Sequence, residues 1–78
     1  MHDDVPFLIV EVLSPADSHA ELMRKFADYA RLSIPHIWLV DPIAKQLSIY
    51  RDGSLIATPR LELPDHSFAI TACEVFEA

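Results

Sequence analysis

The sequence predicts an α+β fold in which one main helix crosses a mixed β-sheet. Several short apolar runs, separated by turn signals such as Asp-Pro and Asp-Gly, are typical of strands. A single stretch, residues 20–32, combines helix-forming residues with apolar side chains at helical spacing. A chain of 78 residues has room for one small core, so we expect residues 1–78 to form a single domain. The expected element order is β-α-β-β-β-β with a short C-terminal helix.

The first strand is predicted within residues 6–15, PFLIVEVLSP, where an apolar run is bounded by prolines. Continuous runs of this kind are typical of strands covered on both faces. Side chains alternate along a strand, so Glu11 should share a face with Ile9 and Leu13. An ionised carboxylate among apolar neighbours is costly unless it is paired, hydrogen-bonded or bound to a metal. Glu11 is therefore the first candidate for a functional residue.

The main helix is predicted to begin at Asp17 or Ser18 and to end near residues 32–33. Ser18 followed three residues later by Glu21 matches a capping box, in which the two residues satisfy free N–H groups of the first turn. Pro35 should end the helix, because it lacks a backbone donor and biases the preceding residue away from the helical conformation.

The rest of the chain predicts strands separated by turns. The strand at residues 36–41 should lie parallel to the first strand, because a strand-helix-strand unit crosses over to a parallel neighbour. Asp52-Gly53 is typical of a tight hairpin. The remaining expectations are strands at 47–51, 54–58 and 67–70 and a terminal helical turn that docks Val75 and Phe76.

The composition limits the classes of function. The net charge is −6 and the pI is near 4.9, which argues against tight non-specific binding to nucleic acid through Lys and Arg. One cysteine, Cys73, excludes an internal disulfide and fits a reducing compartment. The N-terminal MHDDVPF has acids where a signal peptide has basic residues, and no long apolar stretch follows. We expect a cytoplasmic protein without a membrane span.

Three charged residues form a candidate constellation. If the helix packs back over the sheet, Glu21 and Lys25, one helical turn apart, can approach the strand end that carries Glu11. Two carboxylates can hold Mg²⁺ while the ion keeps several waters. A lysine beside the ion can orient an attacking water and offset developing negative charge. The pattern suits metal-assisted hydrolysis of a phosphodiester.

Two segments carry a family resemblance. EVLSP at 11–15, the downstream Lys25 and Tyr29, and IPHIWLVDP at 34–42 resemble the Uma-two family of restriction-endonuclease-like proteins, in the PD-(D/E)XK nuclease superfamily. The resemblance implies a deoxyribonuclease that uses Mg²⁺ and acts on DNA. It implies catalytic roles for Glu11, Glu21 and Lys25, with Glu11 and Glu21 as metal ligands.

The resemblance also implies that the chain is N-terminally truncated. Family members are roughly twice this length. The chain would then be the C-terminal half of a restriction-endonuclease-like domain, without the N-terminal catalytic acid. Two alternative functions therefore stay open: a non-catalytic remnant, or a small acidic module that binds another protein.

Structural roles compete with functional ones at several positions. Glu11 could be a strand-end carboxylate facing solvent, and Glu21 with Lys25 could be an exposed helical ion pair. Asp41 is expected to start a turn and Trp38 to lie in the core. The single cysteine is expected to be a small buried hydrophobe, and all four histidines to be surface residues: His2, His19, His36 and His66.

The first strand also predicts association with a second copy of the chain. If the truncation removes one neighbouring strand, the segment 7–14 presents an unpaired apolar edge. Only Glu11 and the nearby Asp3 and Asp4 would protect it from pairing with another chain. We therefore expect a homo-oligomer with residues 5–14 at or near the contact.

Overall fold

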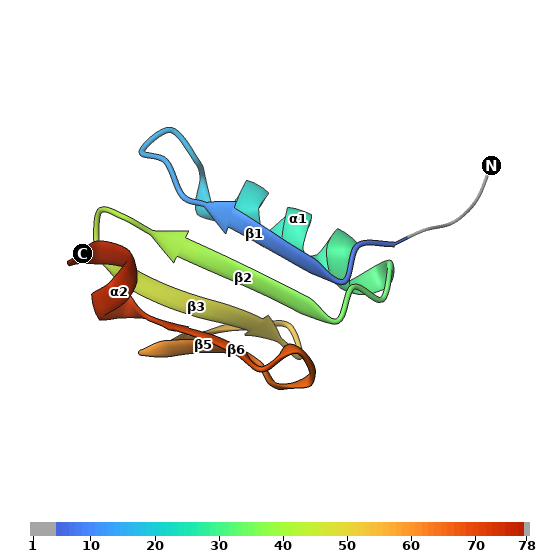
Figure 1. Ribbon diagram of the computed structural model, residues 1–78. Helices are drawn as coiled ribbons and strands as arrows, with labels where there is room; N and C mark the ends of the chain where they lie inside the picture. The colour runs from blue at the N-terminus through green and yellow to red at the C-terminus, as the bar shows by residue number, and fades with distance from the viewer. Residues whose placement is uncertain (1–4, 78) are drawn as a thin grey trace.

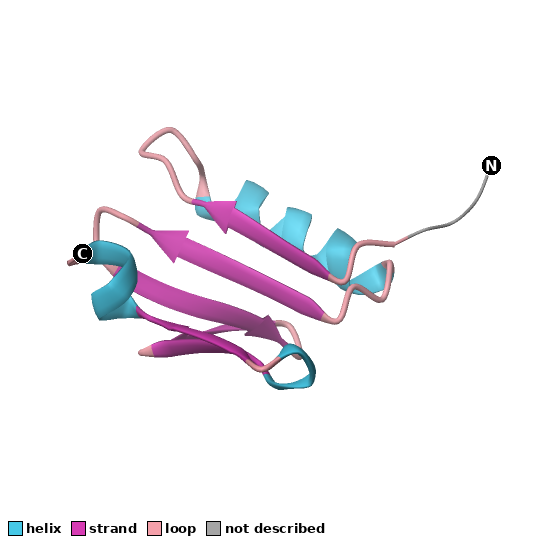
Figure 2. Cartoon of the chain, viewed as in Figure 1, coloured by secondary structure: helices cyan, strands magenta, loops and turns pink. Residues whose placement is uncertain are grey.

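The computed structural model describes residues 5–77 and has the predicted α+β architecture (Figure 1; Figure 2). It contains a four-stranded sheet and a two-stranded sheet. The elements in chain order are β1 (Leu8–Val12), α1 (His19–Arg31), β2 (His36–Asp41), β3 (Gln46–Arg51), β4 (Ser54–Thr58), β5 (Arg60–Leu63), a 3-10 turn η1 (Pro64–His66), β6 (Phe68–Thr71) and α2 (Ala72–Phe76).

The four-stranded sheet follows the chain, with the order β1-β2-β3-β4. β1 and β2 are parallel, as the strand-helix-strand pattern predicted, and Glu11 lies opposite Leu39. The other pairs, β2 with β3 and β3 with β4, are antiparallel. The sheet is therefore mixed. Within the described residues β1 pairs with β2 alone, so it forms one edge of the sheet.

Local hydrogen bonds set the ends of α1. Ser18 is the N-cap, and its hydroxyl accepts a hydrogen bond from the Glu21 N–H at 3.0 Å. The helix ends at Arg31, with the N–H of Leu32 bonded back into the last turn and Ser33 in the left-handed region at φ 62°. The predicted start and end of the helix are both confirmed.

The Asp52-Gly53 hairpin is also confirmed. Both residues have positive φ, 50° and 81°, which is the backbone geometry of a tight turn between twisted antiparallel strands. Glycine adopts this conformation without steric cost, which explains why the only glycine of the chain lies here. The turn sets the register in which Arg51 faces Ser54.

The C-terminal region differs from the sequence prediction. Arg60–Leu63 forms a strand, β5, that was not predicted, and it pairs antiparallel with β6 in a separate two-stranded sheet. The short stretch was missed because it lies between two prolines and two of its four residues are charged. Its alternation is nevertheless clear, since Leu61 and Leu63 are buried while Arg60 and Glu62 are exposed.

Two hydrophobic clusters hold the layers together, one on each face of the four-stranded sheet. The α1 face contains Leu22, Phe26, Ile34, Ile37 and Leu39. The hairpin face contains Trp38, Leu47, Leu61 and Leu63, with Val75 and Phe76 of α2 packed against them. The predicted docking of the terminal helix is thus confirmed. Figure 1 shows α1 on one side of the sheet and β5, β6 and α2 on the other.

The expectation that the first strand is covered on both faces holds at Leu8, which packs against the hairpin-face cluster, but is wrong at Val10 and Val12. Ile9 and Leu13 pack against the α1 cluster, but Val10 and Val12, on the opposite face, are 46% and 62% exposed. The β5–β6 hairpin packs against Trp38 and Leu47 in β2 and β3, leaving the end of β1 open. A continuous apolar run does not distinguish a buried strand from an exposed sheet edge.

Candidate active site at the end of strand β1

Glu11 is placed by the alternation of β1. Its neighbours of the same parity, Ile9 and Leu13, belong to the α1 cluster, so the Glu11 side chain lies on the helix side of the sheet. It lies one residue before the C-terminal end of β1, and its side chain is 22% exposed. The carboxylate is thus partly removed from water at the margin of a hydrophobic core, as the sequence predicted.

Two residues of α1 meet the two oxygens of this carboxylate. The Tyr29 hydroxyl donates a hydrogen bond to Glu11 Oε2 at 2.6 Å. Lys25 Nζ lies 3.4 Å from Glu11 Oε1, a long ion pair made by a lysine that is 52% exposed. Lys25 and Tyr29 are four residues apart, so both extend from one side of the helix. The predicted approach of Lys25 to Glu11 is present in the structure.

The carboxylate changes the acid-base chemistry of the tyrosine. The hydrogen bond to Glu11 raises the pKa of Tyr29 to about 12, with burial and the negative charge of Glu11 as further causes. Each effect favours the neutral phenol over the phenolate. Tyr29 therefore stays protonated at neutral pH and remains a donor to Glu11.

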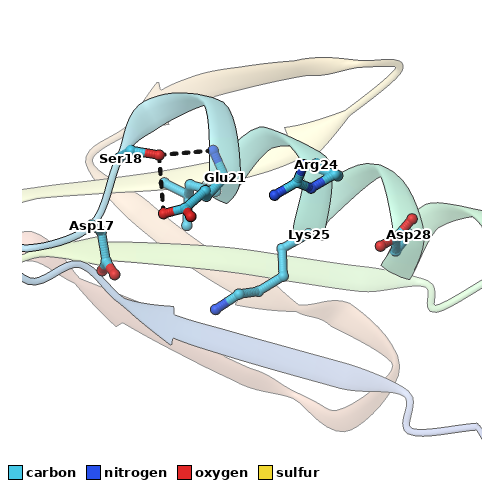
Figure 3. A pocket seen from close by; sticks show the side chains of 7 residues that line it. Asp17, Ser18, Glu21, Arg24, Lys25 and Asp28 are labelled. Carbon is cyan, nitrogen blue, oxygen red and sulfur yellow. Dashed lines mark hydrogen bonds between the residues drawn. The ribbon is translucent and has the colours of Figure 1, made fainter.

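Glu21 is not joined to this group. Its Oε1 accepts a hydrogen bond from the Ser18 hydroxyl at 3.1 Å and not from the Ser18 N–H, so only the Ser18 half of the predicted capping box forms (Figure 3). Glu21 does share a surface depression of about 330 Å³ with Lys25, and the depression is lined by Asp17, Ser18, Glu21, Leu22, Arg24, Lys25 and Asp28. Figure 3 shows Lys25 extending from the helix towards β1, while Glu21 stays beside Ser18. The predicted metal role of Glu21 therefore remains a prediction.

The donor set fits a metal ion only in part. Among residues 5–77, no three His, Cys, Asp or Glu side chains form a group that could hold a metal. Mg²⁺, however, often takes only one or two protein carboxylates and completes its shell with water and substrate phosphates. Glu11 suits such a ligand, because Oε1 already meets a cation, the Lys25 ammonium. The described residues thus include one carboxylate whose position suits a metal ion.

Several predicted structural roles are confirmed. Asp41 starts the β2–β3 turn, where its Oδ1 accepts hydrogen bonds from the N–H groups of Ile43 and Ala44, both at 3.0 Å. Trp38 is buried in the hairpin-face cluster. Among the described histidines His19 and His66 are exposed.

Other expectations need correction or lie outside the described residues. Cys73 is exposed, because α2 turns Val75 and Phe76 inwards. His36 is half-buried against the Phe7 ring, with centroids 5.5 Å apart. His2, Asp3 and Asp4 lie outside the described residues.

Sequence reasoning underestimated Tyr29. Tyr29 was named from the sequence only as part of the family resemblance, whereas in the structure its ring packs against the α1 cluster. The i,i+4 spacing to Lys25 was the available signal, since a residue one turn beyond a site lysine faces the same strand. The 2.6 Å bond makes Tyr29 the nearest partner of Glu11.

The fold of the chain resembles that of a protein whose crystal structure is known. A crystal structure described as "a putative nuclease belonging to DUF820 from Anabaena variabilis ATCC 29413" superposes with a TM-score of 0.77 at 19% sequence identity. The match covers 94% of this chain and 45% of that one, so this chain spans less than half the length of its structural neighbour. No curated protein matches the chain. The chain therefore shares the fold of this neighbour.

Most of the chain also matches a known protein family. The sequence profile described as "Putative restriction endonuclease" (Uma2) matches residues 2–72. The chain belongs to this family, as the EVLSP and IPHIWLVDP segments indicated. Among the described residues, no helix is long and apolar enough to cross a membrane.

Proposed function

We propose that the chain is the C-terminal part of a restriction-endonuclease-like domain that hydrolyses DNA phosphodiesters with Mg²⁺. The observation that carries the proposal is the pairing of Glu11, at the end of β1, with Lys25 of α1 at 3.4 Å. This pairing brings one carboxylate suited to a metal ion and one cation suited to a phosphate to the same point on the surface. Membership of the family supports the proposal.

Glu11 would hold the metal through its carboxylate, with Glu21 as a second ligand if its side chain leaves Ser18. The bound ion would lower the pKa of a water and offset charge on the phosphoryl group. Lys25, exposed and on a flexible stem, would then release Glu11 and donate to a phosphate oxygen or to the attacking water. Arg24, which lines the same depression, offers a second contact to the DNA backbone.

Cleavage by this chain alone should be slow. One or two carboxylates hold Mg²⁺ weakly and leave the attacking water poorly positioned. The overall charge of −6 also opposes DNA binding, since affinity for the phosphate backbone depends on Lys and Arg. We therefore expect nicking only at high protein concentration and low salt.

The test is relaxation of supercoiled plasmid in Mg²⁺ or Mn²⁺. Glu11→Gln and Lys25→Met should each lower the nicking rate by about 100-fold or more, because each removes a group that stabilises the transition state. Glu62→Gln is the matched control, since Glu62 pairs with Arg60 at 2.6 Å on β5 and lies outside the site. Its rate should equal that of the wild type.

Two results would contradict the proposal. Full nicking by Glu11→Gln would show that a contaminant or another site cuts the DNA. A folded wild-type chain that never nicks DNA would favour the non-catalytic interpretation, or the acidic interaction module that the charge of −6 suggests.

We further propose that the chain acts as a homo-oligomer in the cytoplasm, with contacts through the β1 region. Among residues 5–77 the outer edge of β1 has no strand partner, and Val10 and Val12 beside it are exposed. Antiparallel pairing of two β1 strands about a two-fold axis would satisfy the backbone groups of this edge and bring the exposed valines of the two copies side by side. The single exposed cysteine is compatible with a reducing compartment.

Sedimentation at micromolar concentration tests the oligomer. Val12→Lys should weaken association at least tenfold, because it places a charge on the open edge. Ile43→Lys, which changes an aliphatic residue of similar exposure (66%) in the β2–β3 turn, should leave it unchanged. A stable wild-type monomer would contradict this proposal.

A further inference from the structure

The two oxygens of Glu11 have partners of different character. Oε2 accepts a short hydrogen bond from the neutral Tyr29 hydroxyl, at 2.6 Å. Oε1 faces the charged Lys25 ammonium at 3.4 Å, beyond the usual length of a charge-assisted hydrogen bond. The carboxylate is therefore held firmly at one oxygen and loosely at the other.

The rest of the structure strengthens this asymmetry. The Tyr29 ring packs into the α1 cluster, with its centroid 6.3 Å from that of Phe26, which is fully buried. This packing fixes the position of the tyrosine hydroxyl. Lys25 has no such anchor, since its side chain is 52% exposed and a lysine stem has many rotamers. A rigid donor therefore lies on Oε2 and a movable cation lies near Oε1.

We propose that Tyr29 is a positioning residue that clamps Oε2 of Glu11, so that Oε1 alone is presented to a cation. The inference rests on the proposed function, in which that cation is a divalent metal ion, and it adds a role that the Glu11–Lys25 pair does not contain. Lys25 occupies Oε1 in the structure and competes with a metal for it. Tyr29 and Lys25 thus have opposite effects on metal binding, although both contact the same carboxylate.

The clamp also explains why the hydroxyl matters at this position. A phenylalanine could fill the same space in the α1 cluster, but it could not hold Glu11. A partner that hydrogen-bonds a metal ligand orients that ligand, and its loss typically weakens metal affinity by about 10- to 100-fold. Because Glu11 is only partly buried, we expect the Tyr29→Phe effect to be about tenfold.

The first experiment follows the Glu11 side chain by NMR and needs no metal. Three-bond couplings about χ1 of Glu11 should report one rotamer in the wild type and an average over rotamers in Tyr29→Phe. Tyr50→Phe is the matched control, since the Tyr50 ring packs on the same Phe26 ring, with centroids 5.3 Å apart. Removing the Tyr50 hydroxyl should leave the Glu11 couplings unchanged. Unchanged couplings in Tyr29→Phe would overturn the proposal.

The second experiment measures Mn²⁺ binding by the electron paramagnetic resonance signal of the free ion. Tyr29→Phe should bind about tenfold more weakly than the wild type. Lys25→Met should bind up to about fivefold more tightly, because an exposed competing charge is removed. Tyr29→Phe and wild type binding equally would overturn the clamp, since a purely structural tyrosine predicts equal affinities.

The two experiments separate this inference from the proposed function. Equal Mn²⁺ binding by the wild type and Glu11→Gln would count against the proposed metal site. The NMR couplings would still decide whether Tyr29 positions Glu11. Averaged couplings in Tyr29→Phe would support the positioning role in that case, and unchanged couplings would reject it.

Discussion

The two faces of the four-stranded sheet are built from similar amounts of apolar side chain but contain different chemistry. The α1 face packs Leu22 and Phe26 of the helix on the sheet, and Glu11, Lys25 and Tyr29 meet at its margin. The hairpin face packs Leu61 and Leu63 on Trp38 and Leu47, and Glu62 at its margin pairs with Arg60 of the same strand.

The difference shows how a small domain can position a polar site. The helix that buries Phe26 also holds the Tyr29 ring, so the hydrophobic cluster fixes a hydroxyl that reaches the carboxylate of β1. The hairpin face contributes only buried apolar surface. The chain needs this contribution to its stability because a small domain buries a limited share of the surface that its unfolded chain exposes. The following variants test whether the two faces are separable in this way.

Core truncation should have the largest effect. Phe26→Ala on the α1 face and Leu61→Ala on the hairpin face remove side chains that are 0% and 2% exposed, and each should lower the free energy of unfolding by about 3 kcal/mol or more. Urea denaturation measures the change. Ile56→Ala, which truncates a side chain that is 44% exposed, is the control and should cost less than about 1 kcal/mol. Equal losses in all three variants would contradict the separation into two buried clusters.

High pH should weaken the α1 face alone. The folded-state pKa of Tyr29, about 12, lies above its ordinary value of 10.0, so its contribution is complete below pH 10 and is lost as the pH rises through 12. The loss should reach about 2 kcal/mol by pH 12. Unfolding free energies between pH 9 and 12 measure it. Tyr29→Phe should lack this loss and Tyr50→Phe should retain it; the same loss in both would assign it to other groups.

Removing the helix caps should have a smaller effect. Ser18→Ala should destabilise α1 by about 1 kcal/mol, and Thr71→Ala, which breaks the reciprocal Thr71–Glu74 box of α2, should cost about 0.5–1 kcal/mol. Thermal unfolding measures both effects. Because Ser18 belongs to the helix that supports the site, only Ser18→Ala should also alter the Glu11 couplings. Altered couplings in Thr71→Ala would show that the two faces are linked.

Loss of the ion pair should have the smallest effect on stability. Lys25→Met removes a long contact made by a half-exposed lysine, so the free energy of unfolding should change by less than about 0.5 kcal/mol. Thermal unfolding in low and high salt measures it. A loss above about 2 kcal/mol would show that the pair is a structural element of the α1 face rather than a site group.

The sequence alone predicted features that depend on residues close together in the chain. The Ser18 cap, the Asp52-Gly53 hairpin and the Asp41 turn each involve hydrogen bonds or backbone angles within three residues. Strand alternation also correctly placed Glu11 on the same face as Ile9 and Leu13. The family resemblance rested on two such short segments, EVLSP and IPHIWLVDP, and was confirmed.

Only the tertiary structure decided which side chains meet. Tyr29 and Lys25 reach Glu11 across 18 and 14 residues, and Glu21 stays with Ser18, although all three helix residues could have approached β1. The separate β5–β6 sheet and the exposure of Val10 and Val12 likewise depend on where the C-terminal hairpin packs. Local patterns fix backbone conformation because their hydrogen bonds close within a turn, whereas long-range contacts depend on how whole faces pack together.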